Sequence, residues 1–282
     1  MDKNFALLGL NVYPKISTPK GSRSREKIFQ AFKRYYAASG HEYSSRVIQA
    51  RFEVHRKYGM SREDIEHFDL SVCYGLLVNT VPAVSWALLA IYSNPTLLSQ
   101  VRETLSPCLQ AQSSSSGIDM ETILKECPLL SSLVQEILRL RSTNASGRVV
   151  MADTVLDNKY LLKKDSMLLI PSAELHNNDS VFASPQTLSP ERFMQKKPSA
   201  SAYRAFGGGA SYCPGRFLAM NEICSILIMM LMKYDIKPVK GGEWALPKGK
   251  PHITTSILTP EKDVRVSIEE RKEVEGTGVL FK

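Results

Sequence analysis

The spacing of apolar residues along the chain predicts a mainly helical protein. Apolar positions recur every three or four residues over 22–37, with basic residues opposite them, which is the pattern of an amphipathic helix. Longer apolar segments at about 65–92, 128–141 and 217–234 predict three further helices. Another helix is expected to begin at Pro95, because proline fits the first turn of a helix.

After the helix predicted over 128–141, the period of the apolar pattern falls toward two residues. The segments RVVMADTVL, KYLL and SMLLIP predict short strands, with a turn at Lys164-Asp165. TTSILTP and VRVSIEER, near the end of the chain, predict a final hairpin. Residues 176–212 have little periodicity, as is typical of long functional or disordered segments. We therefore expect a mainly α protein with small β-sheets (α+β), as a single domain over residues 1–282.

Composition and charge narrow the class of protein. With 43% hydrophobic and 23% charged residues, the chain can bury a sizeable core. The five cysteines are an odd number without a CxxC pair, so neither a disulfide framework nor a structural zinc site is expected, and a reducing compartment is. The net charge of +8 fits a solvated surface of mixed sign, or docking to an acidic protein. Nucleic acid is not expected, because no basic cluster is interleaved with aromatic residues.

Neither a targeting segment nor a membrane anchor is expected in this chain. The first ten residues lack a basic segment and a small-residue cleavage site. No apolar run approaches the roughly 20 residues that span a bilayer. ILIMMLM, at 226–232, is the nearest to it.

A glycine-rich loop that contains a cysteine precedes the last long apolar segment. It reads FGGGASYCPGR over residues 206–216. Glycines allow a tight turn and a close approach to a flat ligand, and Pro214 fits a first helical turn. Cys213 is therefore expected at a helix N-terminus, where the helix dipole favours a thiolate. Such a thiolate suits an iron ion that needs a soft axial ligand.

Two other interpretations of the loop stay open on these residues alone. A single cysteine is commonly a small buried hydrophobic residue, and three glycines in a row are commonly an ordinary loop. A phosphate-binding loop is not expected, because no Lys-Ser or Lys-Thr pair follows the glycines.

The loop resembles FxxGxxxCxG, the haem-binding loop of the cytochrome P-450 family. Three other segments resemble family motifs in the same order and spacing: Asn79-Thr80 in the oxygen-activating helix, Glu136 to Arg139 as the ExxR helix, and residues 190–193 as the PERF segment. The resemblance implies the mainly helical P-450 fold. It also implies haem b as the cofactor, with Cys213 as the axial ligand of its iron.

The resemblance gives the remaining matched residues their expected roles. The residues expected to contact haem are Phe206, Gly207, Gly209, Gly215 and Arg148, the last against a propionate. Asn79 and Thr80 are the candidate catalytic residues, which would position dioxygen and water. Glu136 and Arg139 can pair on one helix face, and the family adds Arg192 to form a structural network. His176 is expected in a surface loop, and a position near a haem propionate is the less favoured alternative.

The sequence departs from the family pattern in three respects. Asn79 stands where the family usually has an acid, and an amide cannot relay protons as a carboxylate does. The same helix contains Pro82, which is not one of these three departures and which should kink the helix beside Asn79. Ser211 stands where many relatives carry an Arg or His for a propionate. A full-length member is also considerably longer than 282 residues, so we expect an N-terminally incomplete P-450 domain.

The expected function is that of a haem-thiolate monooxygenase. It would insert one oxygen atom from O2 into an apolar substrate, in lipid, sterol or secondary-metabolite biosynthesis. The NTxPA run resembles a branch that holds sterol hydroxylases, prostacyclin synthase and fungal secondary-metabolism members, so a redox-neutral isomerase or dehydratase is an alternative. An inactive fragment without haem is another.

The family also implies a partner and a place in the cell. An NADPH-dependent reductase would dock on a basic face that includes Arg216 and Lys196 or Lys197. A full-length version is expected on the cytosolic face of the endoplasmic reticulum membrane, and this chain, which lacks an anchor, in the cytoplasm. The sequence does not name the substrate.

Overall fold

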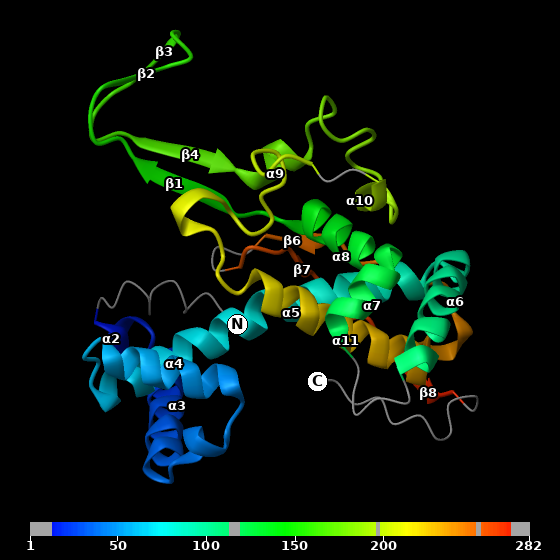
Figure 1. The fold of residues 1–282 in the computed structure, drawn as a ribbon, viewed down its shortest axis with the longest axis horizontal. Coiled ribbons are helices and arrows are strands. Elements are labelled where there is room, and N and C mark those ends of the chain that lie inside the picture. The colour runs from blue at the N-terminus through cyan, green and yellow to red at the C-terminus, as the bar shows by residue number, and fades with distance from the viewer. Residues whose placement is uncertain (1–12, 113–118, 196–197, 252–254, 272–282) are drawn as a thin grey trace. The chain divides into compact units, whose positions relative to one another are not determined.

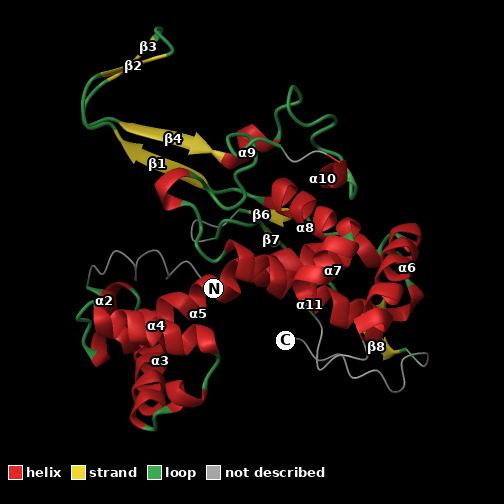
Figure 2. Ribbon diagram, viewed as in Figure 1, coloured by secondary structure: helices red, strands yellow, loops and turns green. Residues whose placement is uncertain are grey.

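The computed structural model describes residues 13–112, 119–195, 198–251 and 255–271 (Figure 1). Most of these residues are helical, with small antiparallel sheets of two strands each (Figure 2), so the predicted α+β class is confirmed. The helices are α2 (Pro14–Ser17), α3 (Pro19–Ala37), α4 (Arg46–Lys57), α5 (Arg62–Tyr92), α6 (Pro95–Gln112), α7 (Met120–Glu126), α8 (Pro128–Arg141), α9 (Ser172–His176), α10 (Arg192–Gln195) and α11 (Arg216–Lys233). Short 3-10 turns are η1 (Gly40–Tyr43), η2 (Gly209–Ser211) and η3 (Val239–Gly241).

Contacts within the chain divide it at Val78 into two compact units. In the first unit, the Tyr36 side chain of α3 is buried and stacks on the ring of Phe52 in α4, and its hydroxyl donates to Asp69 at 2.5 Å. Arg51 pairs with the other oxygen of the same carboxylate at 2.8 Å. Burial, and then the hydrogen bond to Asp69, raise the pKa of Tyr36 well above its usual value. Tyr36 is therefore a neutral donor that joins α3 to the start of α5.

The second unit holds the main hydrophobic core. Its centre is formed by side chains with no exposed surface, from the C-terminal part of α5 and from α6, α8 and α11: Ala87, Ile91, Leu105, Leu133, Leu227 and Leu231. Burying each leucine fully contributes about 1.5–3 kcal/mol. The predicted helices over 128–141 and 217–234 correspond to α8 and α11, and these two elements position the candidate site.

Four strand pairs complete the second unit. They are β1 (Ala145–Val149) with β4 (Met167–Pro171), β2 (Thr154–Leu156) with β3 (Tyr160–Leu162), β5 (Tyr234–Pro238) with β8 (Val266–Glu270), and β6 (Gly249–Lys250) with β7 (Thr259–Pro260). The β2–β3 hairpin extends from the β1–β4 pair (Figure 1). Its turn residues Asp157 and Asn158 both have φ near 51°, a left-handed conformation that these residue types tolerate. The predicted turn at Lys164-Asp165 is confirmed, with φ 65° at Asp165.

The predicted final hairpin is wrong. β8 pairs with β5, and β7 pairs with β6, so the two segments at the end of the chain do not pair with each other. β5 directly follows α11, and its Ile236 is buried in the core beside that helix. β5 is thus held in place by the core and pairs with β8. The alternation of residues within β8 predicts a strand but does not show which strand it pairs with.

One element of the described residues, α5, is long and apolar enough to cross a membrane by length and composition alone. The prediction made from uninterrupted apolar runs did not single out this helix, and the expectation that the chain carries no membrane anchor stays a prediction. Polar residues such as Asn79, Thr80 and Ser85 interrupt the run, yet its mean hydropathy over 18 residues is 1.6. Within the second unit, Ala83 and Trp86 of this helix are buried in the protein core. The helix continues through Pro82, and the kink expected there stays a prediction.

Candidate haem-binding site

The glycine-rich loop folds back on itself before α11 begins. The amide of Cys213 donates to the carbonyl of Phe206 at 3.0 Å, which closes the loop. Gly207 and Gly209 have φ of 76° and 65°, values that other residues adopt only at a cost. Arg216, the first residue of α11, donates from Nη1 to the carbonyl of Cys213 at 3.1 Å. Cys213 is therefore held, with a free and half-buried thiol, at the start of α11.

Arg148 reaches the loop from β1. Its Nη2 donates to Ser211 Oγ at 2.8 Å and to the carbonyl of Gly208 at 3.1 Å, while Nη1 donates to the carbonyl of Gly147 at 2.7 Å. The serine that replaces a basic residue of the family pattern thus contacts Arg148 itself. The arginine and the loop are fixed to each other by these bonds.

The ExxR and PERF residues meet in the interior. The Glu136 carboxylate, which is fully buried, accepts hydrogen bonds from Arg139 at 2.8 and 2.9 Å and from Arg192 Nε at 3.0 Å to both oxygens. The amide of Ser189 adds a further donor at 3.1 Å. Arg139 also donates to the carbonyls of His176 and Pro185 at 2.6 and 2.7 Å. The structure therefore brings together all three residues of the expected network, through side chains that have little access to water.

His176 is not the surface residue that the sequence suggested, since it is only 1% exposed. Its Nδ1 lies 3.0 Å from the carbonyl of Arg139, and its Nε2 lies 2.8 Å from the amide of Arg204. Because the amide can only donate, Nε2 is the acceptor and Nδ1 carries the proton. Burial lowers the pKa of His176 to about 4. The neutral ring thus links the ExxR helix to the segment that leads into the glycine loop. Polar residues around His176 made a surface loop the natural expectation, and only the tertiary contacts bury it.

Asn79 and Thr80 contact two different parts of the second unit. Asn79 Oδ1 accepts from the amide of Ser256 at 2.8 Å. Thr80, which is 5% exposed, donates from Oγ1 to Glu222 Oε2 on α11 at 3.2 Å. Glu222 lies six residues beyond the start of α11, or about 9 Å along its axis. The carboxylate that contacts Thr80 thus comes from another helix.

Sequence reasoning missed Glu222, although a signal for it was present. It is the only charged residue between Arg216 and Lys233 in an otherwise apolar helix, and such a residue needs a partner. Gly208 was also missed: a Cβ there would lie 2.7 Å from Nη1 of Arg204, so a side chain at this position would displace the guanidinium of Arg204. No local pattern distinguishes Gly208 from its neighbours.

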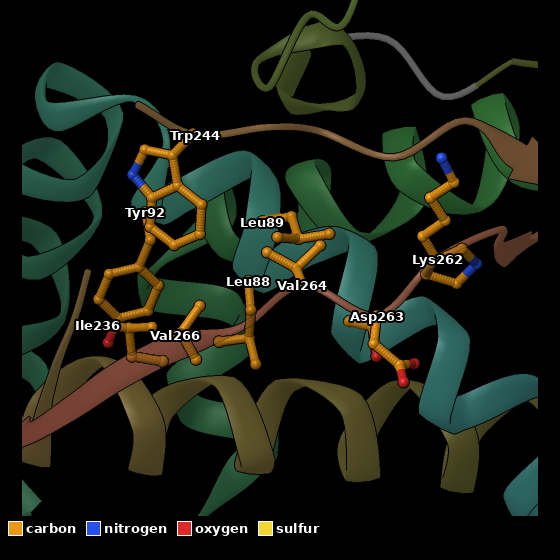
Figure 3. A pocket seen from close by; sticks show the side chains of 11 residues that line it. Leu88, Leu89, Tyr92, Ile236, Trp244, Lys262, Asp263, Val264 and Val266 are labelled. Carbon is orange, nitrogen blue, oxygen red and sulfur yellow. The ribbon is translucent and has the colours of Figure 1, made fainter. Parts of the chain in front are cut away.

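A cavity of about 500 Å³ lies elsewhere in the second unit. Leu88, Leu89 and Tyr92 of α5 face the strands β5 and β8 across it, with Trp244 at one end (Figure 3). No residue of the glycine loop lines this cavity, so it is separate from the candidate site.

The residues around Cys213 fit a haem group. Among the described residues, His, Cys, Asp and Glu side chains nowhere gather in the threes or more that would hold a bare metal ion. One cysteine thiolate instead suits an iron that a macrocycle already ligates. Arg148 and Arg204 place positive charge beside the loop, as the carboxylates of a haem require. The Nε of Arg204 is buried without a hydrogen-bond partner.

Comparison with known proteins identifies the class. The family model described as Cytochrome P-450 matches residues 25–268, and the chain belongs to the cytochrome P-450 family, as the motifs predicted. This family carries haem ligated by a cysteine thiolate.

Individual relatives sharpen this assignment. The chain is 32% identical to cytochrome P-450 monooxygenase nodJ of Hypoxylon pulicicidum, over 96% of this chain and 56% of that protein. It is 28% identical to a cytochrome P-450 monooxygenase of Gibberella zeae, over 79% and 46%, and 27% identical to cholesterol 7-alpha-monooxygenase of Cricetulus griseus, over 69% and 43%. The chain spans about half the length of the curated relatives it matches.

Proposed function

We propose that the chain is part of one cytochrome P-450 domain, over residues 1–282, and carries the haem-binding portion of a monooxygenase. The observation that carries the proposal is the free thiol of Cys213, held at the start of α11 by a loop whose glycines adopt left-handed backbone conformations. Haem b bound there would supply the activation of O2, with the thiolate favouring cleavage of the O–O bond. Phe206, Gly207, Gly209, Gly215 and Arg148 are the residues proposed to hold it.

The residues of α5 would serve the reaction by orienting water and protons. Thr80 Oγ1 is within hydrogen-bond distance of Glu222 Oε2, so it can pass a proton between this carboxyl group and a bound water. Asn79 Oδ1 accepts a hydrogen bond from the amide of Ser256, so Asn79 holds the segment around Ser256 against α5. The amide group of Asn79 does not titrate. In this proposal Glu222 supplies the acid that position 79 lacks. Glu136, Arg139 and Arg192 keep the expected structural role.

The substrate and partners follow from the class. We propose an apolar substrate of the lipid, sterol or secondary-metabolite type, in keeping with the cholesterol named for one relative and the fungal source of two others. An NADPH-dependent reductase would provide electrons, with Arg216 as a candidate contact. The other candidates, Lys196 and Lys197, lie outside the described residues. A longer version would lie on the cytosolic face of the endoplasmic reticulum membrane.

The amide at position 79 favours a second candidate, a redox-neutral isomerase or dehydratase that needs no proton delivery. A monooxygenase consumes NADPH in step with product when a reductase is present, whereas an isomerase forms product without it. Substrate turnover with no NADPH consumption would replace the first proposal by the second.

Haem ligation is tested by the reduced CO-difference spectrum of the purified chain reconstituted with haem b. We expect a thiolate-type band for the wild type and its loss in Cys213→Ser. Cys73→Ser, at an exposed cysteine of the first unit, is the matched control and should keep the band. A wild type that takes up no haem, or a Cys213→Ser protein with an unchanged spectrum, would contradict the proposal and favour an inactive fragment.

A further inference from the structure

A second arginine, Arg204, borders the glycine loop and has no role in the family pattern as matched here. Its backbone is fixed on three sides: the amide donates to His176 Nε2 at 2.8 Å, and the carbonyl accepts from Ser172 Oγ at 3.1 Å and from Asn144 Nδ2 at 3.3 Å. The direction in which its side chain leaves the backbone is therefore determined by the scaffold.

The side chain of Arg204 runs toward the middle of the three glycines. A Cβ built on Gly208 would lie between 2.7 and 2.8 Å from the guanidinium atoms, so the group lies directly against the loop backbone. Its Nη2 makes one long contact, 3.5 Å to Ser146 Oγ. Its Nε is buried and makes no hydrogen bond. The side chain is close to the loop, yet its donors are poorly used.

Arg148 and Arg204 approach the loop from the same face of β1. Ser146 and Arg148 are two residues apart on this strand, so their side chains point to one side of it. Arg204 contacts the first of these residues, and Arg148 donates to Gly208 and Ser211. In the described part of the chain neither guanidinium is paired with an Asp or Glu carboxylate. Two positive charges without a counter-ion thus lie beside the same short segment.

Two such charges repel each other, so an anion that contacts both of them would be stabilised. Ser211 is neutral and directs Arg148 by a single hydrogen bond. The positive charge that position 211 lacks is present instead on Arg204, earlier in the chain, whose side chain reaches the same loop.

We propose that Arg204, together with Arg148, binds the propionate carboxylates of haem, and that Arg204 supplies the positive charge which Ser211 cannot. The inference rests on the proposed haem ligation by Cys213. It also explains why position 208 is a glycine, since any side chain there would displace the Arg204 guanidinium.

The test compares two probes, haem b and its dimethyl ester, whose propionates are uncharged. Each is titrated into apoprotein of the wild type, Arg204→Ala, Arg204→Lys and the control Arg265→Ala, which removes one exposed positive charge elsewhere. We expect Arg204→Ala to weaken haem b binding about tenfold, as is usual for loss of a charge-assisted hydrogen bond, and Arg204→Lys to weaken it less. Binding of the dimethyl ester should be the same in the wild type and Arg204→Ala, and Arg265→Ala should bind both probes as the wild type does.

The outcomes separate the inference from the function on which it rests. A wild type that binds neither probe would overturn the proposed function, and this inference with it. If the wild type binds haem b and Arg204→Ala binds it with the same affinity, the inference alone would be overturned. Equal weakening for haem b and the ester would also overturn it, because the arginine would then act on the loop and not on the propionates. Far-UV circular dichroism of each apoprotein checks that the variants are folded.

Discussion

Replacing Glu136 by glutamine tests whether the buried network stabilises the second unit. The Glu136 carboxylate has no exposed surface and accepts hydrogen bonds from Arg139, Arg192 and the amide of Ser189. Glutamine keeps the shape but removes the negative charge, and it turns an amide group toward guanidinium donors. Arg139, which is 1% exposed, is then left as a buried cation without a counter-ion.

The size of the effect follows from this burial. Removing one partner of a buried ion pair costs about 3–5 kcal/mol. For a unit of this size each kcal/mol lowers the melting temperature by about 2–4 °C, so a decrease of roughly 6–20 °C is expected. Thermal unfolding followed by far-UV circular dichroism measures it.

Glu191→Gln is the matched control, because this glutamate is exposed and lies next to Arg192 in the chain. Its melting temperature should stay close to that of the wild type. Combining Glu136→Gln with Arg192→Gln should cost less than the sum of the single changes, since the two residues share one network. A Glu136→Gln protein that melts with the control would refute the stabilising role of the network.

Three further predictions concern other buried groups. Burial lowers the pKa of His176 from 6.5 to about 4, so the unfolded state takes up a proton first as the pH falls. The free energy of unfolding should therefore fall by about 3 kcal/mol between pH 7 and pH 4 because of this residue. His176→Gln should reduce the slope of melting temperature against pH, and an unchanged slope would contradict a buried neutral His176. The sulfurs of Cys108 and Cys127 lie 2.8 Å apart, so one molecule of hydrogen peroxide should oxidise the two thiols to a disulfide and form two molecules of water. Peptide mapping in which both cysteines still react with an alkylating reagent after peroxide treatment would refute this prediction. Leu133→Ala, at a fully buried position, should cost about 2–5 kcal/mol in urea unfolding, whereas Leu246→Ala, at an exposed one, should cost far less.

The local elements of the fold were predictable from the sequence because their signals are local. α8 begins at Pro128 and α11 at Arg216, both within a residue or so of the predicted starts. Apolar spacing and proline at a first helical turn determine such helices without reference to the rest of the chain. α4 was missed although its apolar and polar residues are separated about as clearly as those of α3, which was predicted, so a local signal for it was present.

Long-range pairings were not predictable in this way. The pairing of β8 with β5 and the burial of His176 depend on which segments meet in space. The same holds for Glu222, which meets Thr80 across 142 positions of the chain. A sequence pattern shows that a charged residue in an apolar helix needs a partner, but it does not show which residue that partner is.

The ExxR, PERF and glycine-loop motifs could each be assigned from the sequence. In the structure the ExxR helix and the glycine loop are connected through His176, which belongs to none of these motifs. Glu136 fixes Arg139, and Arg139 donates to the His176 carbonyl while its own carbonyl accepts from the ring. The other ring nitrogen holds the amide of Arg204, two residues before Phe206, whose carbonyl closes the loop onto the amide of Cys213. A buried ion pair is only weakly justified by stability alone, since well-packed apolar residues often serve as well. Its value here is positional: a rigid, fully bonded network sets the start of the glycine loop, and the loop in turn sets the thiol. A ligand atom must be held this closely when the group it binds supplies the chemistry and the protein supplies the geometry.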